Sequence, residues 1–136
     1  MNMNPNGTPQ TSRWFDQVKA FTEAMGQPVG VPQDEFSYVY WYSEAFSLRR
    51  QLLREETEEV LLAESWENLT KELADLLYVT IGFAVTFGLP LVEVFERVHQ
   101  SNMSKLGEDG KPIYREDGKV MKGPNYRPPE LGDLFS

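Results

Sequence analysis

The chain has 136 residues, a net charge of −8 and no cysteine, with 40% hydrophobic and 25% charged residues. This composition is typical of a single globular domain, and the lack of cysteine excludes disulfide bonds and thiolate metal sites. The negative charge argues against a nucleic-acid partner, because binding to a phosphate backbone needs lysine and arginine. No membrane-spanning apolar stretch or signal peptide is recognisable, so we expect no membrane partner and a cytoplasmic location.

The N-terminal part predicts a polar, disordered segment followed by a helix. Residues 1–11 are rich in Asn, Pro, Gly, Thr and Gln, a composition that favours disorder. Residues 12–26 carry apolar side chains at helical spacing, namely Trp14, Val18, Phe21 and Met25. Ser12 is a candidate N-cap of this helix, and Gly26 is a candidate C-cap.

Three further helices are predicted at residues 37–64, 67–87 and 90–105. Gly88 and Pro90 separate the last two, because Gly favours a helix end and Pro a first turn. Four helices with short connections indicate an all-α fold, a four-helix bundle that occupies residues 12–106.

The predicted helix 67–87 is apolar almost all round, which is typical of a helix buried on every side. A single small bundle can hardly cover such a helix. We therefore expect an oligomer in which a second subunit covers it, and the alternative is a well-covered monomer.

Residues 107–136 differ in character from the helices. They contain several prolines and two Asp-Gly turn signals, and residues 113–121 are compatible with a short hairpin. We expect an irregular C-terminal tail that packs on the active site or closes over it.

The glutamates of "LLREETEEV" (52–60) divide between two faces of their predicted helix. Relative to Leu52 at the centre of the apolar stripe, Glu59 lies within about 20°, Glu56 about 40° to one side and Glu55 about 60° to the other. Glu58 falls on the opposite, solvent-facing half. We therefore expect three of the four carboxylates to face the interior.

Glu72 and Asp75 repeat this pattern on the next helix, where a spacing of three places both on one face with apolar neighbours. Buried carboxylates that lie close together need compensation. Bound cations provide it, and oxygen ligands select hard ions such as Mg²⁺ or Mn²⁺. The alternative is that Arg49 or lysines of the tail pair with these acids in structural salt bridges.

The two acidic blocks fit E-E-x-x-E and E-x-x-D, with twelve residues between them. Together with "KELADLLYVTIG", "VHQSNMSKL" and "GKVMKGPNYRPPEL", they make residues 14–131 resemble the MazG-like all-α nucleoside triphosphate pyrophosphohydrolases. The similarity is to the short, single-domain branch of that family. Dimeric dUTPases and phosphoribosyl-ATP pyrophosphohydrolases are its relatives.

The resemblance implies a helical homodimer or homotetramer that hydrolyses a nucleoside triphosphate to the monophosphate and pyrophosphate with Mg²⁺ or Mn²⁺. More than one ion per site is expected. By matched position, Glu55 would hold or deprotonate the attacking water. The ions would be held by Glu56, Glu59, Glu72 and Asp75.

Basic and amide side chains are needed to approach the phosphates from the side away from the metals. Asn102 and Lys105 are candidates because they fall nearer the apolar than the acidic face of the predicted helix 90–105. Lys119 and Lys122 could close over the phosphates from the tail. For each lysine the alternative is a solvated surface charge.

The base pocket is least defined by the sequence. The aromatic run "YVYWYSEAF" contains Trp41 and other rings that could stack on a base, although such rings more often belong to a core or interface. The family includes enzymes that prefer dUTP or dCTP and others that prefer dGTP or GTP. We favour a purine substrate such as dGTP, with the pyrimidine nucleotides as the alternative.

Two other classes of protein are weaker alternatives. The spacing of Glu96 and His99 fits the E-x-x-H motif of di-iron bundles, but these need two such motifs and the chain has one histidine. A packed or hydrogen-bonded role for His99 is favoured. A non-enzymatic dimerisation or nucleotide-binding module would not need inward acids on two helices.

Overall fold

The computed structural model describes residues 10–31 and 43–135, and within these ranges the fold is all-α, as predicted. The expected disorder of residues 1–11 concerns mainly residues that lie outside the described ranges. The helices are α1 (Gln10–Ala24), α3 (Glu44–Leu61), α4 (Trp66–Thr86) and α5 (Leu91–Met103), followed by the short 3₁₀ helix η1 (Gly132–Leu134).

The chain forms two compact units that divide between Leu89 and Pro90. The first contains α1, α3 and α4, and the second contains α5 and the C-terminal tail. Among the described residues no single helix is long and apolar enough to cross a membrane; only α4 and α5 counted together reach that length and composition.

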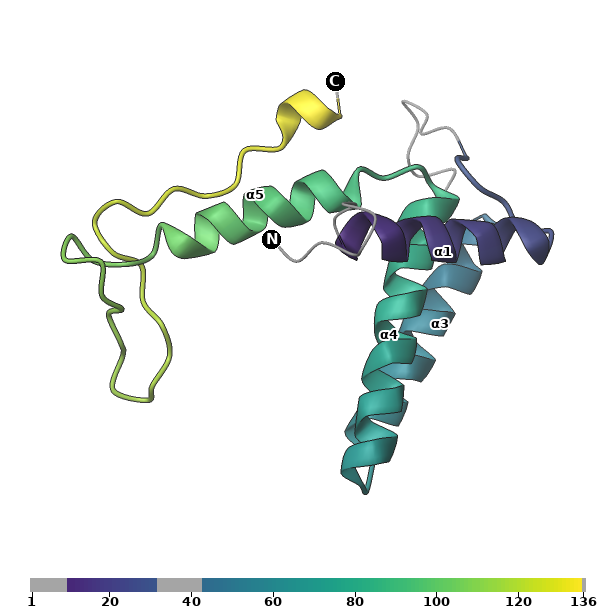
Figure 1. Ribbon diagram of the computed structural model, residues 1–136, viewed down its shortest axis with the longest axis horizontal. Helices are drawn as coiled ribbons and strands as arrows, with labels where there is room; N and C mark the ends of the chain where they lie inside the picture. The colour runs from purple at the N-terminus through teal and green to yellow at the C-terminus, as the bar shows by residue number, and fades with distance from the viewer. Residues whose placement is uncertain (1–9, 32–42, 136) are drawn as a thin grey trace. The chain divides into compact units, whose positions relative to one another are not determined.

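In the first unit α3 and α4 run side by side in opposite directions, and α1 crosses them near the end of α4 (Figure 1). Serine caps set the start of both long helices. The hydroxyl oxygen of Ser43 accepts a hydrogen bond from the Phe46 N–H at 3.2 Å, and that of Ser65 accepts one from Asn68 at 3.0 Å. The helix expected from residue 37 is described from Glu44 onward, and residues 37–42 lie outside the described ranges.

Glycine ends α1 and α4 in the same way. Gly26 has φ 69° and Gly88 has φ 60°, the left-handed conformation that glycine adopts at a helix end. The C-cap prediction for Gly26 is confirmed. The N-cap prediction for Ser12 is wrong, because α1 begins two residues earlier, at Gln10.

The loop after α1 is held against the end of α4 by backbone hydrogen bonds. Gly30 N–H donates to the Val85 carbonyl at 3.0 Å, and Val31 N–H donates to that of Thr86 at 2.8 Å. These bonds satisfy carbonyls that the last turn of a helix leaves unpaired. They join the loop after α1 to the C-terminal end of α4.

The core of the first unit lies around the C-terminal half of α4 and contains Val18, Ile81, Ala84, Val85 and Phe87. Phe46 packs edge-on against Phe83 at a centroid distance of 5.2 Å and contacts the buried Phe87 at 5.7 Å, so this half-buried aromatic residue lies at the edge of the core. Burial of α4 on every side is not found within one chain, since Leu73 and Leu77 remain 49% and 42% exposed.

In the second unit the tail is attached to the end of α5. Gly123 N–H donates to the Lys105 carbonyl at 2.8 Å, and the Ser101 hydroxyl donates to the Arg127 carbonyl at 2.7 Å. The hairpin compatible with residues 113–121 is present as a single antiparallel bridge between Tyr114 and Val120. Its turn places Gly118 at φ 86°.

Candidate active site

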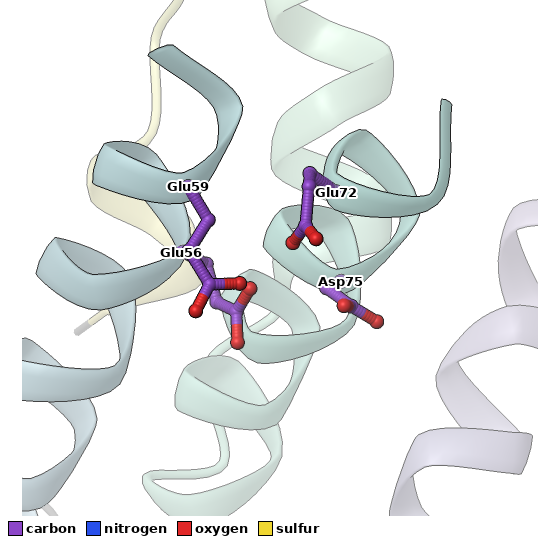
Figure 2. Close-up of side chains that lie close together, drawn as sticks. All are labelled: Glu56, Glu59, Glu72 and Asp75. Atoms are coloured by element: carbon purple, nitrogen blue, oxygen red, sulfur yellow. The ribbon is translucent and has the colours of Figure 1, made fainter. Parts of the chain in front are cut away.

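Four of the five predicted acidic residues come together between α3 and α4. Glu56 and Glu59 lie on α3, Glu72 and Asp75 lie on α4, and each offers a carboxylate oxygen within 4.8 Å of the others. Figure 2 shows the side chains from the two helices gathered in one place. Glu56 and Glu59 are about one helical turn apart, as are Glu72 and Asp75, so each pair lies on one face of its helix. The antiparallel packing of α3 and α4 places these two faces opposite each other.

The burial of this acidic cluster is uneven. Glu72 is 6% exposed, Glu56 and Asp75 are half-buried, and Glu59 is exposed. Asn68 donates to Glu72 Oε1 at 3.3 Å. Oε2 of Glu72 and Oε2 of Glu56 are buried and receive no hydrogen bond. Buried carboxylate oxygens without donors are costly, so this set of oxygens fits a bound hard cation.

The cluster raises the pKa of two of its members. Burial raises the pKa of Glu56, and the charges of Asp75 and Glu72 add to the effect. The pKa of Glu59 is raised first by a hydrogen bond with Glu72 and then by the charges of Glu72 and Glu56. The two shifts differ in their first cause but share a further one, which is the repulsion between neighbouring carboxylates.

Lys71 is the cation nearest to this acidic cluster. Its Nζ lies 2.7 Å from Asp75 Oδ2 and 3.4 Å from Glu72 Oε1. The two carboxylates raise the pKa of Lys71, chiefly through the hydrogen bond to Asp75. The side chain is nevertheless 63% exposed, so the ammonium group lies at the edge of the cluster.

The inward orientation predicted for Glu55 is wrong within the single chain. Its side chain is exposed, and Oε1 accepts a hydrogen bond from Gln51 Nε2 at 3.0 Å on the same helix. The position about 60° from the centre of the stripe lies beyond the edge that α4 covers. Glu58 is exposed, as predicted.

The alternative that Arg49 pairs with the acids is also wrong. Arg49 is 6% exposed, and Nη2 donates to Gln27 Oε1 at 2.9 Å. Within the described ranges no carboxylate lies within ion-pair distance of it. Burial lowers the pKa of Arg49. The guanidinium fills the space above Gly82, where a Cβ atom would lie 2.7 Å from Nη1.

The predicted substrate-binding residues belong to the second unit, except for Trp41, which lies outside the described ranges. Asn102 is exposed near the end of α5, and Lys105 is half-buried one turn later. Lys119 is exposed on the hairpin, where its N–H donates to Asp117 Oδ1 at 3.1 Å. The Lys122 ammonium lies 4.7 Å from the centre of the Tyr126 ring.

The di-iron alternative finds no support among the described residues, where the four-carboxylate cluster is the one group of at least three acidic or histidine ligands. His99 is exposed on α5, so the packed role favoured for it is not observed.

Sequence reasoning missed three residues that contact the acids. Asn68 and Lys71 precede Glu72 and Asp75 by four residues, and Gln51 precedes Glu55 by four. That spacing places each pair on one helix face. It was the signal that could have found them.

Comparison with known proteins gives the family. The profile described as phosphoribosyl-ATP pyrophosphohydrolase matches residues 18–102, which include both acidic blocks. A solved structure from Exiguobacterium sp. 255-15, whose assignment as an NTP pyrophosphohydrolase is itself provisional, is 29% identical and covers 91% of each chain, with a TM-score of 0.46. No curated protein matches the sequence.

The described helices form an all-α fold in which carboxylates of two helices gather at one point and could hold a metal ion. The profile match covers more than half of the sequence, and the chain belongs to the phosphoribosyl-ATP pyrophosphohydrolase family, a relative of the MazG-like enzymes. The protein is a pyrophosphohydrolase, and the non-enzymatic alternative is set aside.

Proposed function

We propose that the protein hydrolyses a nucleoside triphosphate to the monophosphate and pyrophosphate, using Mg²⁺ or Mn²⁺ held by Glu56, Glu59, Glu72 and Asp75. The observation that carries this proposal is the convergence of these four carboxylates within 4.8 Å in a chain of this family. The two buried oxygens without donors support it, because a cation would satisfy them.

The chemistry divides between the ions and the protein. Bound Mg²⁺ or Mn²⁺ supplies a Lewis acid that offsets phosphate charge and acidifies water. Glu55 adjoins the cluster in sequence and has an exposed carboxylate, so it is available to hold the attacking water and accept its proton. The water oxygen forms the new P–O bond while the bridge between the α- and β-phosphoryl groups breaks. Pyrophosphate leaves with the electron pair of that bridge.

Phosphate contacts in the proposal come from Asn102, Lys105, Lys119 and Lys122. Attachment of Gly123 to the Lys105 carbonyl supports a common role for two of them, because it holds the backbone next to Lys122 at the end of α5. Trp41 is proposed to stack on the base. A purine triphosphate such as dGTP or GTP is the proposed substrate. Phosphoribosyl-ATP is a further candidate substrate, because the matching family is described by its hydrolysis.

The proposed enzyme is a homodimer or homotetramer. An apolar groove of about 340 Å³ on the first unit supports an association, because Trp14, Leu77 and Tyr78 in its lining are exposed in a single chain. The groove is lined by Trp14, Gln17, Val18, Ala74, Leu77, Tyr78 and Ile81.

A product analysis tests the reaction. Purified protein is incubated with each ribo- and deoxynucleoside triphosphate and with phosphoribosyl-ATP, in the presence of Mg²⁺, Mn²⁺ or EDTA, and the products are separated by ion exchange. Monophosphate and pyrophosphate in equal amounts, formed only with metal, are expected. Diphosphate with phosphate, or turnover in EDTA, would contradict the proposal. Fastest turnover of dUTP or dCTP would contradict the purine preference alone.

A further inference from the structure

The protein's own donors compensate the acidic cluster only in part. Glu72 Oε1 receives Asn68 and Lys71, whereas Oε2 of Glu72 and of Glu56 receive no donor. Crowded carboxylates repel one another and would separate unless a positive charge held them. A positive charge close to the cluster therefore keeps it assembled before a metal arrives.

Lys71 is placed to provide that charge. Its ammonium contacts both carboxylates that α4 contributes, Asp75 at 2.7 Å and Glu72 at 3.4 Å. The effect reaches α3 as well, because Glu56 and Glu59 hold carboxylate oxygens within 4.8 Å of those of Glu72 and Asp75, which the ammonium contacts. One cation thus bears on all four acids.

The same contacts place Lys71 in competition with a metal ion. Asp75 Oδ2 and Glu72 Oε1 are oxygens that a hard cation would use, and the ammonium covers both. With 63% of its side chain exposed and a flexible four-carbon stem, Lys71 can move into water when an ion arrives.

We propose that Lys71 is a positioning residue of the metal site, a cation of the protein itself that keeps Glu72 and Asp75 together when no metal is bound and is displaced when the metal binds. This inference rests on the proposed function, because it assumes that the four acids hold a metal. It assigns a role to a residue outside the acidic motifs.

Calorimetry with Mn²⁺ alone tests the inference, using full-length, metal-free protein at pH 8 and constant ionic strength. Lys71→Met removes the competing ammonium and keeps the apolar stem, so we expect Mn²⁺ to bind about two- to fivefold more tightly, the range for an exposed ion pair. Lys19→Met is the matched control. Lys19 is exposed on α1 and is in no ion pair with another described residue. Its replacement removes the same charge and should leave Mn²⁺ affinity unchanged.

A second measurement follows displacement in the wild-type protein. The ¹⁵N signal of the Lys71 ammonium should be visible in the metal-free protein and should shift or broaden during a Mg²⁺ titration, as the ion pairs give way to exchange with water. The midpoints of urea unfolding complete the test. Without metal, Lys71→Met should unfold at a lower urea concentration than the wild type. With saturating Mn²⁺, the two proteins should unfold at the same concentration.

Each outcome decides the inference. Unchanged or weaker Mn²⁺ binding by Lys71→Met overturns it, and so does equal tightening by Lys19→Met, which would indicate an effect of net charge. An ammonium signal indifferent to Mg²⁺ overturns it as well. If the wild-type protein binds no Mn²⁺, the proposed metal site fails together with the role of Lys71. Binding by the wild type without the Lys71 effect leaves the proposed function standing.

Discussion

Glu59 on α3 and Glu72 on α4 hold carboxylate oxygens within 4.8 Å of each other, and the hydrogen bond that this pair can make when one of them is protonated is the first cause of the raised pKa of Glu59. Two ionised carboxylates cannot make that bond, so the metal-free site favours a bound proton. A proton and a metal ion therefore compete for the same oxygens.

Stability of the metal-free protein should depend on pH through Glu56 and Glu59. In the unfolded chain these groups lose their protons near the usual pKa of 4.5, whereas in the folded chain their pKa is raised. Above 4.5 the folded state thus binds more protons, so the free energy of unfolding falls as pH rises and grows as pH is lowered toward that value. Urea unfolding in EDTA between pH 5 and about pH 8 measures this slope.

The control for this dependence is a charge on the other face of the same helix. Glu59→Gln should flatten the slope, whereas Glu58→Gln, which removes an exposed carboxylate, should leave it unchanged. Equal slopes in the wild type and both variants would show that Glu59 does not contribute to the pH dependence of stability.

Replacing Glu72 should separate stability from function. Glu72→Met removes a buried carboxylate with an unpaired oxygen and the repulsion that it exerts on Glu56 and Glu59, so the metal-free protein should gain about 1 kcal/mol in the free energy of unfolding, the lower end of the cost of an unsatisfied buried acceptor. The same change should weaken metal-dependent turnover more than about 100-fold, the upper range for changes next to a metal. Circular dichroism, urea unfolding and product formation check the three parts. A variant that stays active would exclude Glu72 from the site.

Gly82 should resist replacement by alanine although it lies inside α4. In an open helix the change would stabilise by about 1 kcal/mol. Here the new Cβ would lie 2.7 Å from Arg49 Nη1, so Gly82→Ala should destabilise by about 1–3 kcal/mol as the guanidinium is forced from Gln27.

A double-mutant cycle tests the cause of that loss. In an Arg49→Met background the shorter side chain leaves room, and Gly82→Ala should then cost much less. Additive effects of the two changes, measured by urea unfolding, would show that the clash with Arg49 is not responsible.

Gly123 should be required for the attachment of the tail to α5. A Cβ atom there would lie 2.5 Å from the Leu106 carbonyl oxygen and 2.7 Å from that of Lys105, and neither backbone atom can move freely. Gly123→Ala should therefore speed amide hydrogen exchange in residues 123–127. Gly132→Ala, where a Cβ meets nothing within 4 Å, is the control. Unchanged exchange in Gly123→Ala would contradict the role of this contact.

Much of the site was readable from helical periodicity. The phase of the two acidic blocks predicted that Glu56, Glu59, Glu72 and Asp75 would face inward, and the structure brings these four carboxylates together. Glu59, predicted nearest the centre of the stripe, joins the cluster but stays exposed to solvent, so its predicted burial is wrong. Periodicity failed for Glu55 because that residue lies at the edge of the stripe. Whether a residue at the edge of the stripe is covered depends on how the neighbouring helix packs against it. The helical phase of one segment does not specify that packing.

Other features depended on contacts between distant parts of the chain. Arg49 is buried because Gly82, 33 positions later, leaves room for its guanidinium. The tail is held to α5 because the Gly123 N–H and the Ser101 hydroxyl meet carbonyls on the other segment. The sequence by itself determined the helices, their glycine ends and the acidic face of each, since these follow from local backbone preference and a 3.6-residue period. Only the tertiary structure decided which oxygens meet, which lack a donor and which cation lies beside them, because these depend on how two helices pack.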